Sequence, residues 1–428
     1  MLIVLLILLA ITIITSKKNY GLILSPYSIF LSVFTIAYIF LISSDFIIKE
    51  ISELSKLILL LSMITFIIGT YLNLSILKIN KHKLKKNQVE SKVQVNYNNM
   101  LQCIIILFII SSCGFVMNLI YLNSKFGLLN ILLNPVILNT AIANDQVNNS
   151  IHTYMMILSI PNSMLILYYI INNNNSNKKK IFKVMFIFQI LLHFSVKRNR
   201  LFYAIILNLL LYIYTKCKFL NVDRKRKINM RQWFIFVFVA VFMIYIFSNM
   251  QNTLNKQEMI RGEIFGIAIP PSIVTIIKYF SANLVSMGLM LDINYQNISI
   301  GTGTFRFLYK ILESFNLISF DDSYLAMKFV NIPTPYNTAP IQYYIYRDFG
   351  MIGMMIVFFI IGYISSNICM KVIRNKREFD IFYLAIISFI LIMSIREYLL
   401  IFLDFWIIFM TLFIVDKYTQ NKIISKGR

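Results

Sequence analysis

Long apolar runs alternate with short polar segments along the 428 residues of this chain. Repeated runs have the length that a helix needs to cross a bilayer, and a helix satisfies its own backbone hydrogen bonds in lipid. The pattern therefore predicts an all-α polytopic membrane protein with about 11 transmembrane helices, in a range of roughly 10 to 12. The predicted spans are 1–15, 22–42, 57–77, 100–120, 153–171, 181–194, 201–215, 232–249, 343–369, 379–395 and 398–415.

The first apolar run is predicted to be a retained helix with its N-terminus outside. The run MLIVLLILLA has no basic residue before it, whereas Lys17 and Lys18 follow it. A cleaved signal peptide would carry its basic region ahead of the apolar run, and basic residues favour the cytoplasmic side of a span.

Basic residues support one topology. The formal net charge is +23, which invites a nucleic-acid partner, but the Lys and Arg residues cluster in short loops between spans and form no nucleic-acid-binding motif. Alternation from an outer N-terminus puts nearly all of this charge inside, as the positive-inside rule expects, and leaves the C-terminus cytoplasmic. The inner segments are 17–18, 78–92, 178–183, 216–231, 371–380 and the tail from 416.

Two places bear on this count of spans. The runs 181–194 and 201–215 are short for spans, and 264–291 is apolar enough to cross. A crossing at 264–291 would put the basic residues of 371–377 outside, so we expect a helix packed on the outer surface or a re-entrant one.

The outer side then carries two sizeable loops. Loop 121–151 has spaced Leu and Ile residues that suggest an interfacial amphipathic helix. Loop 250–342 contains apolar helical stretches at 264–291 and 305–320, and a loop of this length is usually functional. We therefore divide one integral membrane domain into an N-terminal transmembrane bundle (1–249), a large extracytoplasmic loop (250–342) and C-terminal helices with a cytoplasmic tail (343–428), and expect any chemistry on the outer face.

Histidine and cysteine residues give no sign of a metal site. The four Cys and three His residues are scattered, without a CxxC pair or a His cluster. Neither a disulfide framework nor a zinc site is expected, and we predict no metal or other cofactor.

Basic residues on the predicted outer face are the first candidates for binding. Lys197, Arg198 and Arg200 lie between the two short spans. Charged side chains are costly at this depth in the membrane, so they suggest a functional site. Arg guanidinium groups suit bidentate phosphate binding, while the alternative is a basic flank that reaches lipid phosphates. Arg261 lies between Glu258 and Glu263 and could equally be a solvated loop charge.

The segment Gly301-Thr-Gly303-Thr-Phe-Arg306 resembles a phosphate-binding glycine loop, but it lacks the Lys-Ser/Thr of the P-loop. A turn into the 305–320 helix, capped by Thr302 or Thr304, would explain the glycines as well. Arg306 would then face either the cavity or water.

Residues 333–353 combine polar groups with the start of an apolar run, so they lie where water meets the bilayer. Tyr336, Asn337, Arg347 and Asp348 are candidate catalytic residues there. The alternative is an interfacial belt in which Arg347 and Asp348 neutralise each other. Arg396 and Glu397 lie in a tight connection and are expected to form an ion pair or to line the cavity. Three further carboxylates on the outer side are candidates: Asp292, Asp321 and Asp322.

The chain resembles the oligosaccharide repeat-unit polymerases of bacterial surface polysaccharides, the Wzy-type O-antigen and capsule polymerases. The resemblance lies in the spans, in the large outer loop, and in short motifs: Lys197-Arg198-Asn199-Arg200, Tyr279-Phe-Ser-Ala-Asn283, Gly301-Thr-Gly303-Thr-Phe305, Tyr336-Asn337 and Tyr346-Arg347-Asp348-Phe349-Gly350-Met-Ile-Gly353. It implies a metal-independent, inverting glycosyltransferase of the all-helical membrane type (GT-C type).

The resemblance also implies substrate and location. Such enzymes join oligosaccharides carried on undecaprenyl pyrophosphate at the outer, periplasmic face of the bacterial cytoplasmic membrane, and a chain-length regulator is a possible partner. The expected pyrophosphate ligands are Lys197, Arg198, Arg200, Arg261 and Arg306, with Arg347 close to the reaction. Asp348 is the first candidate for the base that deprotonates the acceptor hydroxyl, before Asp322 and Glu258.

Two other functions stay open. A flippase for lipid-linked oligosaccharides would be a transporter, a class that often shows internal repeats, and none is visible here. Related O-antigen ligases often carry His-Asn where this chain has Tyr336-Asn337, and that departure disfavours a ligase.

Overall fold

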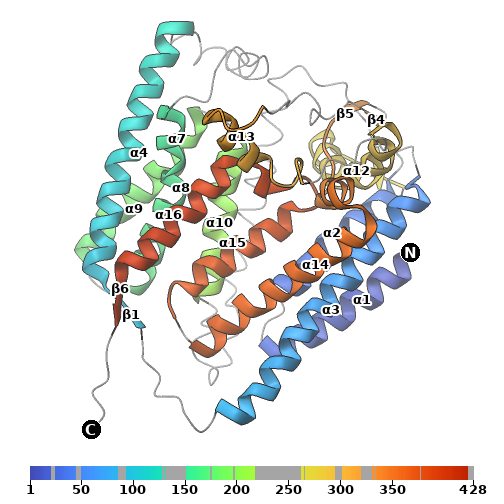
Figure 1. Ribbon diagram of the computed structural model, residues 1–428. Helices are drawn as coiled ribbons and strands as arrows, with labels where there is room; N and C mark the ends of the chain where they lie inside the picture. Colours follow the sequence, from blue (N-terminus) through green and yellow to red (C-terminus); the bar gives the residue numbers. More distant parts are fainter. Residues whose placement is uncertain are drawn as a thin grey trace. The chain divides into compact units, whose positions relative to one another are not determined.

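The computed structural model describes residues 1–20, 25–44, 50–84, 93–127, 130, 151–173, 176–195, 198–216, 262–264, 266–294, 301–319, 330–332, 334–375 and 377–422 (Figure 1). Helices dominate these residues, and six helical segments among them are long and apolar enough to cross a membrane. This is consistent with the predicted all-α membrane protein. The predicted span 232–249 lies outside the described residues.

The six segments match predicted spans. They are α1 (Leu2–Tyr20), α2 (Pro26–Ser43), α3 (Glu53–Leu84), α4 (Tyr97–Phe126), the pair α7 (Ile151–Ile157) and α8 (Ser159–Asn172), and α14 (Ile341–Asn375). Helix α4 extends through 121–126, which were predicted to be loop. Residues 131–150, where the amphipathic helix of the first outer loop was predicted, lie outside the described residues.

The described residues contain further helices. The helices are α9 (Ser176–Leu191), η1 (Leu192–Ser195), α10 (Arg198–Lys216), α12 (Pro271–Asn294), α13 (Arg306–Ser314), α15 (Asp380–Met393), η3 (Leu399–Ile401) and α16 (Leu403–Thr419). The described residues also form three antiparallel strand pairs: β1 (Val93–Val95) with β6 (Gln420–Lys422), β2 (Gly262–Ile264) with β3 (Ile267–Ile269), and β4 (Val330–Ile332) with β5 (Thr334–Tyr336).

Local sequence explains several helix ends. Helix α2 starts at Pro26 behind a capping box, in which Ser25 and Ser28 each accept a hydrogen bond from the other's backbone N–H. Helix α4 starts behind Asn96, whose side chain accepts from the N–H groups of Asn98 and Asn99. These bonds satisfy donors that have no partner within the helix.

The described residues form two compact units that are interleaved along the sequence. The first unit takes its described residues from Met1–Gln88, Val222–Arg374 and Ile387–Leu403, and the second from Val89–Asn221, Asn375–Ile386 and Asp404–Arg428. The predicted N-terminal bundle therefore contributes α1–α3 to the first unit and α4–α10 to the second. Helix α15 is divided between them.

The core of the first unit is built from α2, α3 and α14. The rings of Phe30 and Phe66 lie 4.5 Å apart, and Phe30 also meets Phe358 at 5.8 Å. Two glycines let α3 and α14 approach closely, because a Cβ atom on Gly69 would lie 2.1 Å from the Phe359 carbonyl oxygen and one on Gly362 equally close to the Phe66 carbonyl oxygen. Small residues serve this purpose between membrane helices.

Replacing Gly362 with valine is expected to lower the free energy of unfolding by about 1–3 kcal/mol, because the added side chain forces α3 away from α14. Thermal unfolding in detergent measures the change. Ile360→Val is the matched control, because Ile360 is exposed on the same helix and its substitution should change stability by less than about 0.5 kcal/mol. Equal stability of both variants would contradict this packing.

Helix α14 is broken near its start. Gly350 has φ 65° and ψ −168°, a backbone conformation open almost only to glycine. The break separates a short segment that begins at Ile341 and carries Arg347 and Asp348 from the long apolar segment that follows. The charged residues therefore lie on a short helical piece of their own.

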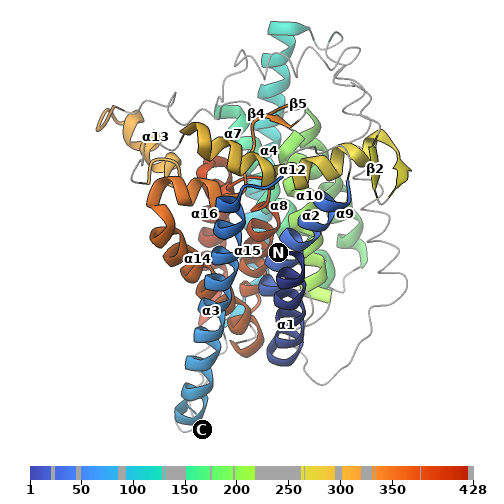
Figure 2. The same ribbon diagram turned by 90° about the vertical axis from the view of Figure 1, so that its right-hand side faces the viewer.

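The described part of the 250–342 loop gathers at one end of the first unit. Figure 2 shows α12 running across the ends of α2 and α3 rather than alongside them. Gly288 of α12 lies against Ser52 and Ser55 at the start of α3, and Ile264 bridges to Ser44 after α2. The predicted topology places both of these helix ends outside.

Helix α12 corrects one prediction in detail. The predicted helix 264–291 begins only at Pro271, because residues 262–269 form the β2–β3 hairpin around Gly266, whose φ is 74°. Two prolines then start the helix, where a missing N–H costs nothing. Residues 281–288 are all buried, so this part of the helix is covered on every side, and α12 packs against α2, α3 and β4.

The second unit packs α4, α7, α8, α9 and α10 together, with α16 beside them (Figure 1). One end is joined by strands, since β1 before α4 pairs with β6 after α16. Near the same end, Glu378 accepts hydrogen bonds from the hydroxyls of Tyr97 (3.0 Å) and Tyr168 (2.9 Å). The predicted topology places all of these segments on the inner side, so the pairings agree with the predicted alternation.

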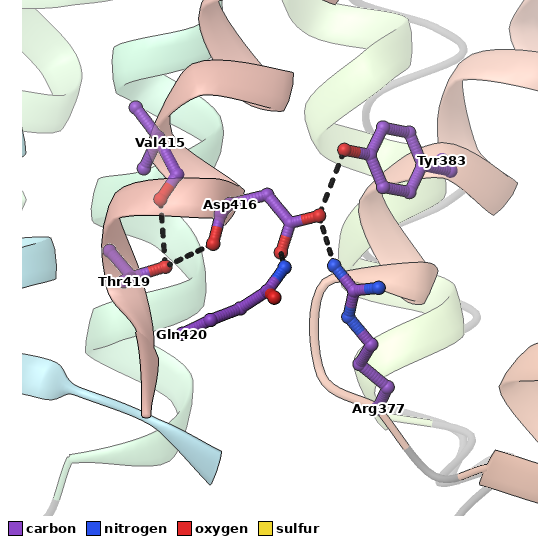
Figure 3. Close-up of polar contacts among 6 residues, drawn as sticks. All are labelled: Arg377, Tyr383, Val415, Asp416, Thr419 and Gln420. Atoms are coloured by element: carbon purple, nitrogen blue, oxygen red, sulfur yellow. Dashed lines mark hydrogen bonds and ion pairs between the residues drawn. The ribbon is translucent and has the colours of Figure 1, made fainter. Parts of the chain in front are cut away.

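Asp416 ties α15 to the C-terminal end of α16. Figure 3 shows its carboxylate accepting from Arg377, from the Tyr383 hydroxyl at 3.1 Å and from the Gln420 amide at 3.1 Å. Asp416 is buried, so its charge needs these partners. The basic loop at 371–380 and the start of the tail at Asp416, which predicted the topology by their charge, are thus also in contact.

Candidate functional site

Asp348 is the centre of the candidate site in the first unit. Its side chain is fully buried. One carboxylate oxygen accepts from the Gly303 N–H at 3.3 Å, and the other accepts from the Thr304 N–H. Both oxygens of the buried carboxylate thus accept a backbone hydrogen bond. The Gly301–Thr304 turn and α14 therefore meet at Asp348.

A side chain at position 303 would crowd this contact. A Cβ atom there would lie 2.5 Å from Nη2 of Arg347 and 2.9 Å from Oδ1 of Asp348. The prediction that Thr302 or Thr304 caps the following helix is wrong, because α13 starts behind Phe305 with no side-chain cap. The N–H group of Thr304 is instead directed to Asp348.

Arg347 lies beside Asp348 on the same helical turn. Its Nε atom is 3.9 Å from Oδ1 of Asp348, and its guanidinium carbon lies 5.5 Å from the centre of the Tyr343 ring. All three residues are buried. The predicted pairing of Arg347 with Asp348 is therefore present, and a cation–π contact accompanies it.

A second buried pair completes the group. Arg396 and Glu397 lie 3.6 Å apart in the connection after α15, so the predicted ion pair is present. Tyr398 lies in the same connection, and its ring centre is 6.2 Å from that of Tyr344. The ring of Tyr344 in turn lies 5.5 Å from the ring of Tyr343. We call the set Gly303, Thr304, Arg306, Tyr343, Tyr344, Arg347, Asp348, Arg396, Glu397 and Tyr398 the Asp348 cluster.

The Asp348 cluster combines cationic, anionic and phenolic groups at the end of the first unit where the predicted outer segments gather. Three arginines supply positive charge suited to phosphate oxygens. The acidic residues keep the group close to balance, and burial strengthens each of these interactions. Such an arrangement can hold an anionic group and offers carboxylates for proton transfer.

Arg200 is the other predicted binding residue whose side chain is described, and it belongs to the second unit. It is buried at the start of α10, where Nε donates to Oδ2 of Asp404 at 2.8 Å and Nη1 donates to the Thr153 carbonyl at 3.1 Å. Nη2 has no hydrogen-bond partner in the described part of the chain. Asp404 was not among the predicted residues, although an acidic residue at the start of an apolar span is a usable signal.

His193 lies close to this pair and was also not predicted as a site residue. Its Nε2 atom is 2.7 Å from the Ser159 hydroxyl oxygen, and that hydroxyl donates to the Met156 carbonyl at 2.7 Å. Nε2 therefore carries the proton and donates to Ser159, which leaves Nδ1 as an acceptor. Within the described residues Nδ1 has no partner.

The remaining predicted residues are placed as follows. Tyr336 ends β5 and packs on the core of the first unit, and Asn337 is exposed after it. The next residue, Thr338, donates to Asn283 at 2.8 Å and accepts from Ser286 at 2.6 Å, which anchors this segment to α12. Arg198 is the first residue of α10. Asp292 is exposed near the end of α12, and Lys197, Glu258, Arg261, Asp321 and Asp322 lie outside the described residues.

A search of the described residues finds no group of three or more His, Cys, Asp or Glu side chains placed to hold a metal ion. In comparisons with known proteins, no family model, curated protein or solved structure matched the chain. The functional assignment therefore depends on the residues and their geometry.

Proposed function

We propose that the protein is a membrane glycosyltransferase that polymerises undecaprenyl-pyrophosphate-linked oligosaccharide repeat units into a surface polysaccharide. The observation that carries the proposal is the Asp348 cluster, a buried carboxylate among arginines where α14 meets a glycine-containing turn. Motifs that resemble the repeat-unit polymerases supply both parts of this contact.

The proposed reaction is an inverting displacement. The acceptor sugar hydroxyl attacks the anomeric carbon of the donor, its proton passes to a carboxylate base, and the bond to the pyrophosphate oxygen breaks. Undecaprenyl pyrophosphate then leaves with the bonding electron pair. Fixed positive groups stabilise the charge that grows on the leaving group, and they need no reorganisation during the reaction.

The described residues take separate parts in this proposal. Arg306 and Arg347 hold phosphate oxygens in the first unit, and Arg200 is a separate candidate for binding an anion in the second. Asp348 is the first candidate for the base. Asp348 also has a structural role, because its carboxylate accepts two backbone hydrogen bonds that hold the Gly301–Thr304 turn against α14.

The test uses the purified protein in liposomes with synthetic undecaprenyl-pyrophosphate-linked repeat units. A polymerase converts single units into chains of several repeats and releases undecaprenyl pyrophosphate. Transfer of units across the bilayer without lengthening would favour a flippase, and attachment of finished chains to a different acceptor would favour a ligase. In cells, deletion of the gene should leave single repeat units, and unchanged chain length in a strain with no second polymerase would contradict the proposal.

A further inference from the structure

Helix α13 carries an apolar face that stays exposed in the structure. None of its residues is buried, and Leu308 is 45% exposed and Phe315, just after the helix, 70% exposed. Arg306, Lys310 and Glu313 occupy a different side of the helix, as the spacing of 3.6 residues per turn requires. The exposed apolar residues of α13 and its flanks are Phe305, Leu308, Leu312, Phe315 and Leu317.

This face adjoins an exposed apolar stripe on α14. The rings of Phe305 and Phe349 meet edge to face, with their centres 6.3 Å apart. Beyond Phe349, α14 exposes isoleucines at every fourth position, beginning with Ile352 at 76% exposure and continuing with Ile356, Ile360 and Ile364. Residues four apart lie on one side of a helix, and α14 is long and apolar enough to cross a membrane. Lipid is the partner that such a stripe fits.

We infer that α13 lies in the headgroup layer of the bilayer, with its apolar face in the acyl boundary and Lys310 near lipid phosphates. The apolar face continues the stripe of α14, and the exposed Lys310 supplies charge that anionic headgroups attract. A nine-residue helix offers too little area for a stable protein partner, which buries about 800 Å² on each side.

The position of α13 has a consequence for the site. The helix follows directly after the Gly301–Thr304 turn, whose N–H groups donate to Asp348. Contact with the bilayer surface therefore holds the turn at a defined depth. The inference concerns where α13 lies and stands whether or not the proposed reaction is correct.

The test measures the depth of single spin labels in the full-length protein. Cys103, Cys113, Cys217 and Cys369 are replaced, and single cysteines are introduced at Leu308 and Leu312 on the apolar face and at Lys310 and Glu313 as matched controls. A label at Ile356 provides the lipid reference. The labelled proteins are reconstituted in phosphatidylethanolamine–phosphatidylglycerol vesicles, and collision with oxygen is compared with collision with a water-soluble nickel chelate.

Labels at Leu308 and Leu312 are expected to collide more with oxygen than with the chelate, as the label at Ile356 does. Labels at Lys310 and Glu313 are expected to collide more with the chelate. Equal chelate access at all four positions would overturn the inference. Protection of Leu308 and Leu312 from both reagents at every protein-to-lipid ratio would also overturn it, since a second copy or another protein segment would then cover the face. Leu308→Trp and Leu312→Trp, read by brominated-lipid quenching, give a second measurement without a label.

Discussion

Replacing Asp348 with alanine is expected to abolish polymerisation and to destabilise the first unit. The substitution leaves Arg347 beside a lost carboxylate and removes the acceptor for the N–H groups of Gly303 and Thr304. Breaking a buried ion pair by removing one partner costs about 3–5 kcal/mol. Loss of a catalytic base lowers the rate by about 10²–10⁴-fold. Liposome activity and thermal unfolding in detergent measure the two effects.

Two further variants separate the base from the anchor. Asp348→Asn keeps one acceptor oxygen but cannot take a proton, whereas Gly303→Ala keeps the carboxylate and crowds Arg347 and Asp348. If Asp348 is the base, the asparagine variant should lose far more activity than the alanine variant at position 303. If it is only an anchor, both variants should lose stability and activity together. Full activity of Asp348→Ala would contradict both roles.

Replacing Arg200 with alanine is expected to abolish polymerisation while the protein still inserts into the membrane. The substitution removes the cation beside Asp404 and the Arg200 donor to the Thr153 carbonyl. The free energy of unfolding should fall by about 3–5 kcal/mol, which thermal unfolding in detergent measures. A loss of activity alone would not show whether the substitution impairs substrate binding or destabilises the fold.

A double replacement resolves that ambiguity. Arg200→Met with Asp404→Leu removes both charges, and apolar residues of similar volume commonly restore the stability lost with a buried pair. The double variant should therefore unfold near the wild-type temperature and still fail to polymerise. Normal activity in Arg200→Ala or in the double variant would remove Arg200 from the proposed site.

Helix positions were largely predictable because the bilayer imposes a length on each apolar run. The run at 100–120 became α4, and the run at 343–369 became α14. The division into two units was not predictable, because it depends on which helices have complementary shapes. The close approach of Gly69 and Gly362 joins helices that are far apart in the sequence, and no periodic pattern marks it.

The contacts of the candidate site were likewise predictable only in part. Arg347 and Asp348, like Arg396 and Glu397, are sequence neighbours, so their pairing could be proposed from spacing alone. Gly303 lies 45 residues before Asp348, and Arg200 lies 204 residues before Asp404. These contacts arise only when separate elements pack together. The glycine turn was noticed for its composition, but its acceptor was visible only in three dimensions.

The break at Gly350 separates the proposed site from the long apolar segment of α14. An unbroken helix would pass any tilt of its apolar segment on to Arg347 and Asp348. With the helical hydrogen bonds interrupted at Gly350, the long segment can tilt to match a thinner or thicker bilayer, an adjustment that costs only fractions of a kcal/mol per Å. The short segment keeps its contacts with the Gly301–Thr304 turn, so the Asp348 cluster can hold one geometry in membranes of different lipid composition.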